Sequence, residues 1–512
     1  MGSRRSLIIA VSAATFLASV AAVAPTSFAA SSTPATRGAV HTVCNGSTSP
    51  CPRGTQYTTI QAAVDAARPG DWVLVWPGVY HEKATGSEGV LIAKAGLHLR
   101  GMDRNRVVVD GSNGDAAHPC PSAAAQQDFT PRSGIVVKDA DDVSVENLTV
   151  CNYLAGTGGE QGNEIWWNGG DGTGTIGIHR YHGAYLTATS EYATADASGQ
   201  MGQYGIFTSN ATGPADLTDT YASNMGDSDY YVGACRNLCG VTLERAHGQN
   251  SALGFSGTNA GGYTIRDSEF DGNRTGLAPN ALNNDDAPPP QDGSCPNDPT
   301  RSCTFIEHNW IHGNNNPNAP GFGLSPVIGV GVEISGGHYD TIRDNLISDQ
   351  GSWGVVTHDY PDYETPPPLS SCQGGVQLPG FCLFQAFGTH VYGNLFARNG
   401  SFGNPTNGDL ADEGTTAPRN CFYGNFDLGG NVTSDPANIQ SAAVGGPPCT
   451  GPGNGDDQLL FGELVCASGA GQCPVPGAAY PQRTGVVLAP LTRQATMPEP
   501  CRGVPRNTLC NK

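Results

Sequence analysis

The chain has 512 residues, of which only 14% are charged, and it contains 70 glycines and 37 prolines. This composition favours short strands and frequent turns over long helices. The formal net charge of −20 argues against nucleic acid as a partner, because such binding needs clustered Lys and Arg. It also disfavours a polyanionic glycan, unless a bound cation or a local basic patch reverses the sign.

The first 29 residues are typical of a secretory signal peptide. Arg4 and Arg5 form a basic start, an apolar run extends from Leu7 to Ala24, and residues 27–29 form a small-x-small cleavage site. A membrane anchor is the alternative, but the apolar run is short and ends at Pro25. No later stretch is apolar enough to span a bilayer. We therefore predict a secreted, extracellular protein with no membrane contact after cleavage.

All 16 cysteines follow this segment, and in an exported chain an even number predicts disulfides. Metal binding would need Cys-x2-Cys pairs with matching histidines, and none is present. The predicted pairs are Cys44–Cys51, Cys120–Cys151, Cys235–Cys239, Cys295–Cys303, Cys372–Cys382, Cys421–Cys449, Cys466–Cys473 and Cys501–Cys510.

After a linker over residues 30–56, the stretch from Tyr57 to Ala67 predicts a helix. Thr58, with Gln61 three residues later, has the pattern of a capping box, and Pro69-Gly70 ends the helix. Short strands are predicted at Asp71–Trp76, Val90–Ala93, Leu97–Arg100 and Val107–Asp110. Residues 57–112 are thus predicted to form an N-terminal cap and the first coils.

Three stretches in this region carry a family resemblance: Ile60-Gln61-Ala62-Ala63-Val64, Arg68-Pro69-Gly70-Asp71 and Trp76-Pro77-Gly78-Val79-Tyr80. Together they resemble the N-terminal segment of secreted right-handed parallel β-helix proteins of the pectin-lyase-like superfamily. In that superfamily the helix caps the open end of the solenoid, where an uncovered strand would template aggregation. The resemblance implies an all-β solenoid and says almost nothing about the reaction.

A repeated line between Ile265 and Asn399 predicts stacked parallel coils over residues 113–400. Each line has an aliphatic residue, Asn or Ser at +3, an apolar residue at +5, and Asn or Gln at +8. Ile265, Ile306, Ile342 and Val391 are expected to stack inside, and Asn309, Asn345 and Asn394 to form an amide ladder at a turn. Residues 401–512 are predicted to be an irregular region, rich in Cys, Gly and Pro, that covers the last coil.

Insertions interrupt this pattern at two corners of the predicted coil. One set follows the Gly–apolar strand, at Ala278–Ser302 and Thr357–Phe387. The other follows the Asn that ends a coil, at Tyr153–Ile178, Met225–Tyr230 and Asn315–Pro326. Because coils stack in register, insertions at one corner gather on one face, which in solenoids is often the binding face.

Asp227 and Asp229 form the first candidate site. Their segment, Met225 to Gly233, resembles Asp-x-Gly-Ile-Tyr-Val-Gly of bacterial parallel β-helix repeat proteins, with Asp229-Tyr230 where Ala-Gly-Ile would be expected. In an extended segment the two carboxylates lie on one side, about 7 Å apart. They can then act as acid and base on a glycoside, or share Ca²⁺. The alternative is a turn in which both bond backbone amides. Tyr230 is expected to contact the substrate.

The second candidate site is the segment from Glu160 to His182, predicted to be a Gly-rich loop at the same corner. Trp166 and Trp167 either pack on the coil or offer flat faces to a sugar ring. The loop's other polar side chains are Glu164, Asp171, His179, Arg180 and His182, of which the last three are predicted to support substrate binding. With the aspartate pair, the loop would make a cleft with aromatic walls and an acidic floor.

The third candidate is His358 with Asp359. Uronate epimerases and lyases of the superfamily carry Asp-Pro-His-Asp, of which Thr357-His358-Asp359-Tyr360 has the His-Asp part only. A histidine of suitable pKa could abstract a C5 proton beside a carboxylate. The alternative is a loop histidine bonded to its neighbour. His308 and His312 are expected on a strand and its turn, without a metal.

Three functions remain open at this stage. The first is an exported enzyme acting on polysaccharide as hydrolase, lyase or epimerase. The second is a non-catalytic glycan-binding or cell-surface protein, and the third a structural extracellular protein. In the first, Asp227 and Asp229 would carry the reaction, with His358 and Asp359 as further catalytic candidates. The predicted partner is a polysaccharide or cell-wall glycan, Ca²⁺ is the one cofactor considered, and the protein is expected to be a monomer.

Overall fold

The computed structural model describes residues 38–84, 86–156, 161–170, 177–194, 200–235, 238–284, 291–321, 326–365, 367–440, 459–469 and 473–510. The predicted signal peptide lies outside these residues. Among the helices that are described, none combines the length and the apolarity needed to cross a bilayer.

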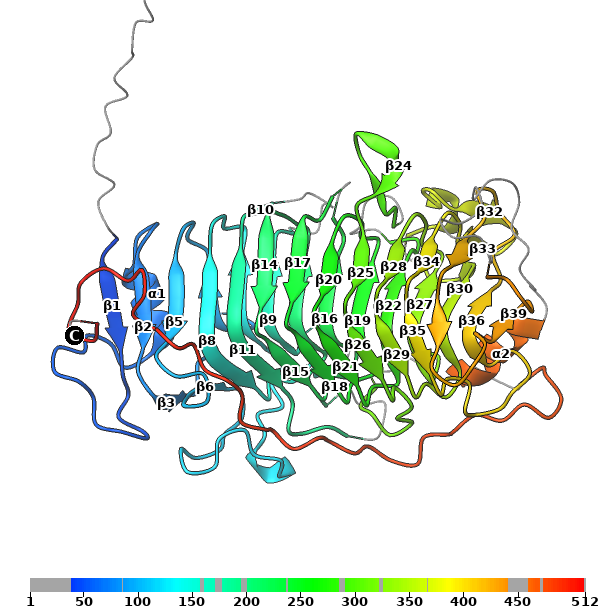
Figure 1. The fold of residues 1–512 in the computed structure, drawn as a ribbon. Coiled ribbons are helices and arrows are strands. Elements are labelled where there is room, and N and C mark those ends of the chain that lie inside the picture. The colour runs from blue at the N-terminus through cyan, green and yellow to red at the C-terminus, as the bar shows by residue number, and fades with distance from the viewer. Residues whose placement is uncertain are drawn as a thin grey trace, which may run out of the picture. The chain divides into compact units, whose positions relative to one another are not determined.

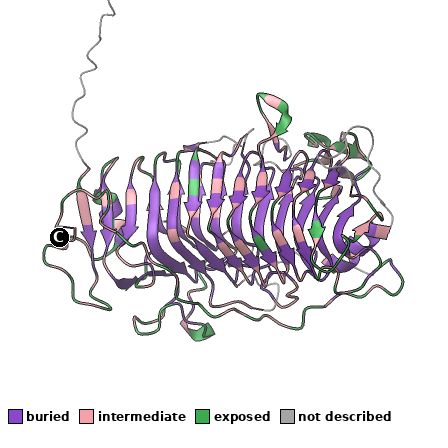
Figure 2. Cartoon of the chain, viewed as in Figure 1, coloured by how far each residue is buried: buried purple, intermediate pink, exposed green. Residues whose placement is uncertain are grey.

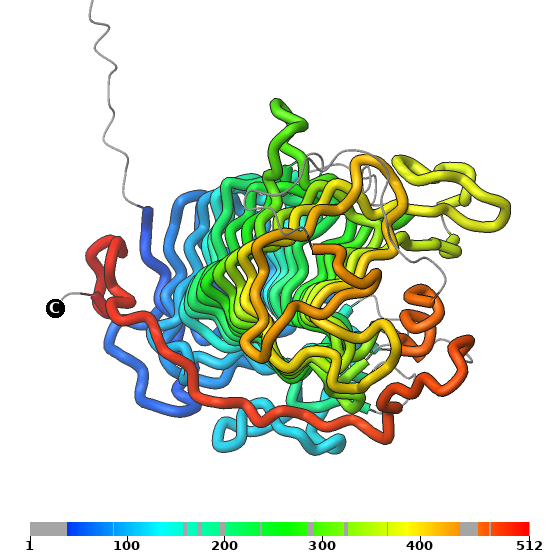
Figure 3. Tube along the Cα trace, turned by 45° about the vertical axis from the view of Figure 1, so that its right-hand side comes forward, coloured from blue at the N-terminus to red at the C-terminus, as the bar shows by residue number. Residues whose placement is uncertain are grey.

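The predicted fold is confirmed: the chain winds into a right-handed parallel β-helix, an all-β solenoid with three faces (Figure 1). Seen turned toward its end, the coils of successive turns lie behind one another (Figure 3). Winding lets each strand pair in parallel with the next coil without the helical crossovers that parallel sheets usually need.

The first face is an 11-stranded sheet. It consists of β4 (Glu88–Ile92), β7 (Ser133–Lys138), β9 (Asn163–Asn168), β12 (Tyr204–Ser209), β16 (Ser228–Gly233), β19 (Leu253–Thr258), β22 (Thr275–Asn280), β27 (Val330–Ser335), β30 (Trp353–His358), β36 (Gly408–Asp412) and β39 (Ser434–Asp435).

The second and third faces share one 21-stranded sheet, because the long strands β8 (Ser144–Cys151) and β11 (His182–Thr189) run through both. The second face adds β1 (Val40–Val43), β2 (Trp72–Val75), β5 (His98–Gly101), β14 (Ala215–Thr218), β17 (Val241–Glu244), β20 (Thr264–Arg266), β25 (Phe305–Glu307), β28 (Thr341–Arg343), β34 (His390–Tyr392) and β37 (Cys421–Tyr423). The third adds β3 (Gly78–Tyr80), β6 (Val107–Asp110), β15 (Tyr221–Ser223), β18 (His247–Gln249), β21 (Glu269–Asp271), β26 (Trp310–His312), β29 (Leu346–Ser348), β35 (Leu395–Ala397) and β38 (Phe426–Asp427).

The core is the inside of the solenoid, and the exposed residues gather in the loops (Figure 2). The stack predicted from the repeat is confirmed, since Ile265, Ile306, Ile342 and Val391 are fully buried and pair in register. Each such aliphatic side chain contributes about 1.5–3 kcal/mol through burial.

The predicted amide ladder is also confirmed. Asn309 Nδ2 donates to Asn345 Oδ1 at 3.0 Å, and Asn345 Nδ2 donates to Asn394 Oδ1 at 2.9 Å. Asn394 continues the ladder to Asn425. The +8 positions form a second ladder, which begins at Asn273 and passes through Asn314, Gln350 and Asn399. Two rows of buried amides therefore satisfy the turns of successive coils.

The N-terminal cap is the helix α1 (Ile60–Ala66), shorter than the predicted helix. Thr59, and not Thr58, is the N-cap, and its side chain accepts from Ala62 N. Both Glu82 oxygens accept from the first amides of the helix, at 2.6 and 3.1 Å, and so take the place of the expected capping box. The buried side of α1, with Ile60 and Val64, covers the open end of the solenoid.

The C-terminal region differs from the expectation in two ways. The coils continue past residue 400, because β36 pairs with β30 and β37 with β34. Beyond them, the helix α2 (Leu459–Ser468) packs through Leu460 and Leu464 on Trp353 and its neighbours at the end of the first face. The last coil keeps part of the repeat, with Asn425 three residues after Phe422, but an aromatic residue stands where the other coils have an aliphatic one.

As predicted, the start of the segment 473–510 covers the C-terminal end, where Val475 and Tyr480 pack beside Trp353. The residues after Tyr480, which were expected to stay at this end, instead run back along the solenoid as a strap (red in Figure 1). Backbone amides of the strap donate to asparagine side chains of the coils, with Ala489 on Asn224, Gln494 on Asn105 and Met497 on Asn147, each at 2.8 Å. Arg100, near the N-terminal end, donates to the carbonyls of Pro500 and Arg502.

Six of the predicted disulfides are formed: Cys44–Cys51, Cys120–Cys151, Cys235–Cys239, Cys295–Cys303, Cys466–Cys473 and Cys501–Cys510. Cys449, the predicted partner of Cys421, lies outside the described residues. The predicted pair Cys372–Cys382 is corrected to two free thiols. The two side chains are in hydrogen-bond contact, and Cys382 Sγ also donates to Leu369 O at 3.2 Å.

The remaining small elements decorate the corners between faces. They are β10 (Ile178–His179) with β13 (Ala211–Thr212), the hairpin β23 (Ser294–Cys295) with β24 (Asp298–Ser302), the sheet of β31 (Tyr360–Asp362), β33 (Phe381–Phe384) and β32 (Val376–Leu378), and the 3-10 turns η1 (Ala124–Gln126) and η2 (Leu369–Ser371). The sheet around β31 is the one that matters for the site, because it overhangs the first face near His358.

Candidate functional site

The two adjacent tryptophans do not lie in a loop. They belong to β9, a strand of the first face that pairs with β7 and β12. Alternation along the strand turns Trp166 outward, while Trp167 is fully buried in the core and stacks on Tyr181 at 5.7 Å. Trp167 is therefore corrected from a sugar platform to a core residue, whereas Trp166 stays on an accessible face.

The sequence pattern did not reveal this strand, because the strand has a glutamate where other strands of the first face have a glycine. Gly205, Gly254 and Gly276 fill the same position on other strands of the first face, and a Cβ there would meet side chains or backbone of the core at 3.0 Å or less. On β9 that position is Glu164, which is fully buried and accepts from Tyr153 N at 3.2 Å. Glu160 and Asp171, the other acidic residues of the predicted loop, lie outside the described residues.

Asp229 fills the same inward position on β16, and this separates it from Asp227. Asp229 is fully buried, with Oδ1 accepting from Ser251 Oγ at 2.6 Å. Burial raises the pKa of its carboxyl well above the usual range. Neighbouring Tyr230 is also inside the solenoid, its hydroxyl bonded to Thr220 and to His247 O. Neither residue can contact a substrate, so both predicted roles are corrected.

Asp227 does reach the surface of the first face, where its Oδ2 accepts from Tyr204 Oη at 2.9 Å. Burial raises the pKa of Asp227 to about 6. Because Asp229 points inward, the two carboxylates do not form the predicted acid–base pair. They do not fit a shared Ca²⁺ either, because that ion gathers six to eight oxygens around one point, and the two carboxylates point to opposite sides of the sheet.

His179, Arg180 and His182 are also away from the first face. His179 and Arg180 lie at a corner, where Arg180 Nε pairs with Asp142 Oδ1 at 2.7 Å. His182 is on the outer side of the second face, between Glu146 and Asp216. Burial lowers the pKa of His182, but these two carboxylates outweigh burial and raise it to about 9. The predicted supporting role is corrected for all three: Arg180 and His182 form surface ion pairs, and the backbone amide of His179 donates to Asp141 Oδ1 at 2.8 Å.

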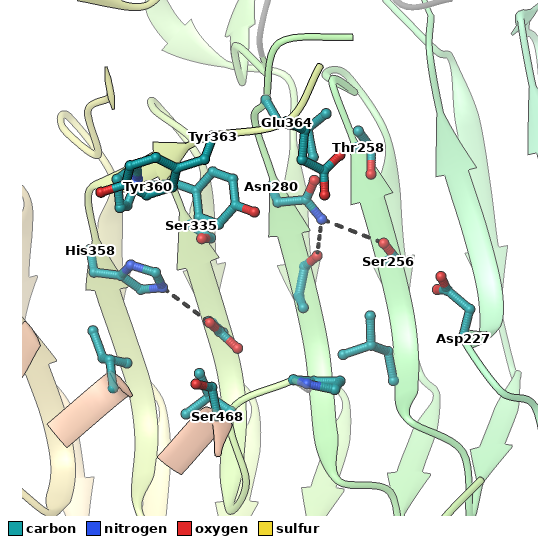
Figure 4. A pocket seen from close by; sticks show the side chains of 18 of the residues that line it. Asp227, Ser256, Thr258, Asn280, Ser335, His358, Tyr360, Tyr363, Glu364 and Ser468 are labelled. Atoms are coloured by element: carbon teal, nitrogen blue, oxygen red, sulfur yellow. Dashed lines mark hydrogen bonds and ion pairs between the residues drawn. The ribbon is translucent and has the colours of Figure 1, made fainter. Parts of the chain in front are cut away.

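What the first face does carry is a groove of about 610 Å³ (Figure 4). Its floor is the outer side of β16, β19, β22, β27 and β30, with the polar side chains Ser256, Thr258, Asn280 and Ser335. One wall comes from β31 and the loop after it, with Tyr360, Tyr363 and Glu364, and the other from α2, with Phe461 and Val465. The α2 wall could not be foreseen, because α2 is distant in sequence and packs on the sheet through tertiary contacts.

His358 and Glu333 form the charged centre of the groove. His358 Nε2 contacts Glu333 Oε1 at 3.0 Å (dashed line from His358 in Figure 4). Its Nδ1 contacts the carbonyl of Asp359 at 2.9 Å. Burial lowers the pKa of His358, but Glu333 and the more distant Glu413 outweigh burial and raise it to about 9. The imidazole is therefore protonated at neutral pH and forms an ion pair in a largely buried place.

The predicted partner of His358 was the wrong carboxylate. Asp359 Oδ1 accepts from the backbone amide of Ala386 at 2.7 Å and so fixes the β33 side of the overhanging sheet. Asp359 is corrected from a catalytic to a structural residue. His358 contacts Glu333 instead, because β27 and β30 pair Ser335 with His358, and Glu333 is two residues before Ser335 on the same side of the sheet.

A row of aromatic side chains extends the groove along the first face. Trp166, Phe207 and Tyr231 occupy matching outward positions on three neighbouring strands. Trp166 stacks on Phe207 at 5.1 Å, and Phe207 stacks on Tyr204 at 4.5 Å. Tyr204 and Tyr231 in turn line the groove, so the row leads from Trp166 into it. Trp166 Nε1 donates to Ser209 Oγ at 3.0 Å, which holds the ring in place.

The charges of the groove are mainly acidic. Asp227, Glu333 and Glu364 line it, together with His358. Among the lining residues that the structure describes, there is no lysine or arginine. Asp227 and Glu333 are separated by three strand spacings, about 14 Å, and so are too far apart to act on one glycosidic bond.

No protein-family model and no curated protein sequence matches the chain. Solved structures with similar folds include the A-module of the mannuronan C-5 epimerase AlgE6 of Azotobacter vinelandii (TM-score 0.40, 16% identity, 73% of this chain and 86% of that chain). They also include an alginate lyase of Paenibacillus sp. str. FPU-7 (0.34, 13%, 73% and 93%). A third is the pectin methylesterase PemA of Erwinia chrysanthemi (0.29, 12%, 77% and 90%). Similarities at this level of identity bear on the fold and not on the function.

Proposed function

We propose that the protein binds an uncharged polysaccharide chain along the first face and hydrolyses it beside the His358–Glu333 pair. The observation that carries this proposal is the combination, on one sheet face, of an aromatic row, a polar floor and a buried imidazolium–carboxylate pair. Aromatic faces stack on sugar rings, and hydroxyls and amides bond sugar hydroxyls. From β9 to β30 the face spans six strand spacings, about 29 Å, enough for an extended chain.

In the proposed reaction, His358 is the general acid that gives its proton to the oxygen of the leaving sugar. Glu333 keeps the imidazole protonated and oriented, and is a positioning residue. Hydrolysis also needs a carboxylate on the other side of the sugar to activate water. Glu364 suits this role, because it is exposed and lines the groove from the loop after β31, where it lies near Asn280 and Thr258 (Figure 4).

Hydrolysis is favoured over elimination or epimerisation of a uronate. Those reactions remove a C5 proton next to a carboxylate, which a cationic group must neutralise. The described lining offers only His358 as a cation, and Glu333 already pairs with it. The acidic groove would repel a polyuronate.

Binding without turnover is the second candidate. One observation favours it: Glu333 and His358 satisfy one another at 3.0 Å, so a proton transfer must break their bond.

The test is a panel of neutral and uronate polysaccharides, assayed for new reducing ends and for the absorbance of unsaturated uronates. We expect reducing ends from a neutral glycan, and His358→Gln to lower kcat by about 10²–10⁴-fold. Trp166→Ala should raise KM about fivefold, since stacking is worth about 1 kcal/mol, with little change in kcat. Trp310→Ala is the matched control, because Trp310 is 46% exposed on the third face. Binding without products supports the second candidate, and unsaturated products would refute hydrolysis.

A further inference from the structure

A second cluster of polar side chains lies away from the groove, on the outer side of the third face. His247 comes from β18, Glu269 and Asp271 from β21, and His312 from β26. His247 pairs in register with Glu269, and Asp271 pairs in register with His312. Two imidazoles and two carboxylates thus project from three consecutive coils at positions that the backbone pairing sets.

The potential ligand atoms converge. His247 Nε2 is 2.6 Å from Asp271 Oδ1, and His312 Nε2 is 3.1 Å from Glu269 Oε1. One ligand atom each of His247, Glu269 and Asp271 lies within 4.8 Å of the others. Ligand atoms about 3.3 Å apart are what tetrahedral coordination with bonds of about 2.0–2.1 Å requires. His247, Glu269 and Asp271 would close around an ion by turning their side chains, and His312, which contacts Glu269, would turn with it to supply the fourth ligand.

Neighbouring side chains orient the residues of the cluster through hydrogen bonds and ring stacking, as the groups around a metal site orient its ligands. Gln249 Nε2 donates to Asp271 Oδ2 at 2.8 Å, and Tyr221 Oη donates to Gln249 Oε1 at 3.2 Å. Trp310 stacks on the ring of His312 at 3.8 Å and fixes its plane. Ligands of a metal are usually oriented by such second contacts. Gln249 also lines a surface cavity of about 650 Å³, through which an ion and its water could approach.

The alternative to metal binding is surface ion pairing, and His182 is an example of such pairing in this protein. His182 also has two carboxylate neighbours, but Asp216 contacts its Nδ1 and Glu146 its Nε2, on opposite sides of the ring. The carboxylates cannot then meet at one ion. At His247, one ligand atom each of the imidazole and of two carboxylates lies within 4.8 Å of the others, and His312 contacts one of these carboxylates, Glu269.

We propose that His247, Glu269, Asp271 and His312 bind a divalent transition-metal ion, with zinc the best match. Imidazole nitrogens favour zinc, cobalt or nickel over calcium and magnesium, which prefer sites made of oxygen alone. The ion would tie three consecutive coils together on the face away from the groove. Because the unfolded chain does not hold these ligands together, the bound ion stabilises the folded protein.

The test uses the full mature chain without a histidine tag, stripped with a chelator. Zn²⁺ titrated by calorimetry should bind at one ion per chain, and Co²⁺ should give the visible absorption of a tetrahedral site. Zn²⁺ should also raise the thermal midpoint. The expected effect of Asp271→Asn, which keeps the shape of the side chain, is at least tenfold weaker binding. His312→Gln should weaken binding as well, and circular dichroism checks that both variants fold.

Asp216→Asn is the matched control, because it removes the carboxylate of a histidine pair outside the cluster. It should leave Zn²⁺ affinity unchanged. The proposal is overturned if wild type binds no stoichiometric Zn²⁺, if Asp271→Asn binds as tightly as wild type, or if Asp216→Asn weakens binding equally. Preference for Ca²⁺ over Zn²⁺ would overturn the choice of metal. None of these outcomes depends on polysaccharide activity.

Discussion

Replacing Asn345 by alanine tests whether the amide ladder holds the coils together. The side chain is 1% exposed and makes four hydrogen bonds. Its Oδ1 accepts from the backbone amide and from Nδ2 of Asn309, at 2.9 and 3.0 Å. Its Nδ2 donates to Ile306 O and Asn394 Oδ1, both at 2.9 Å.

Asn345→Ala removes all four hydrogen bonds and leaves their buried partners with neither a protein group nor water to bond. At a net value of about 1 kcal/mol each, the loss is about 4 kcal/mol, and the unsatisfied partners add to it. The free energy of unfolding, measured by urea denaturation with circular dichroism, should fall by that amount. Hydrogen exchange should increase first at the turns of the neighbouring coils, since a solenoid loses structure locally.

The matched control is Asn113→Ala. Asn113 is exposed, and its side chain donates one bond, to Gln127 O at 3.2 Å. Its replacement should cost less than about 1 kcal/mol. If Asn345→Ala destabilises the protein no more than Asn113→Ala does, the ladder adds nothing to stability and the reasoning fails.

Three further predictions concern buried groups. Burial lowers the pKa of His358 but Glu333 raises it to about 9, above the usual 6.5, so the pair stabilises fully below pH 6.5 and less as pH rises through 9. At pH 6 the free energy of unfolding, measured with urea, should be up to about 3 kcal/mol higher for wild type than for Glu333→Gln. At pH 10 little of this difference should remain. An equal difference at both pH values would contradict the ion pair. Burial raises the pKa of Asp229 well above its usual range, so ionising it costs stability as pH rises above the unfolded value. Asp229→Asn should therefore be no less stable at pH 7 and keep its glycan activity, and a loss of activity above tenfold would contradict the inward placement. Finally, a thiol reagent in denaturant should find two thiols per chain, from Cys372 and Cys382, and none would mean that this pair is oxidised.

The scaffold could be predicted from the sequence because its causes are local. An aliphatic residue facing inward repeats once per coil, and an amide three residues later closes the turn, so Ile306 and Asn309 could be assigned without knowing their neighbours. The N-terminal helix was equally visible, although its N-cap was misplaced by one residue. The sequence thus determined that this chain is a stacked coil, and roughly which side chains stack.

The tertiary structure decided which side chains share a face. Glu164 and Asp229 look like surface carboxylates in the sequence, but they replace glycine at a position that points into the core. His358 finds its partner Glu333 on the preceding coil, 25 residues away, and not at the adjacent Asp359. The inward or outward direction of each side chain depends on strand alternation and on pairing between coils. The order of residues along the chain shows neither of these, so the groove could be recognised only from the stacked coils.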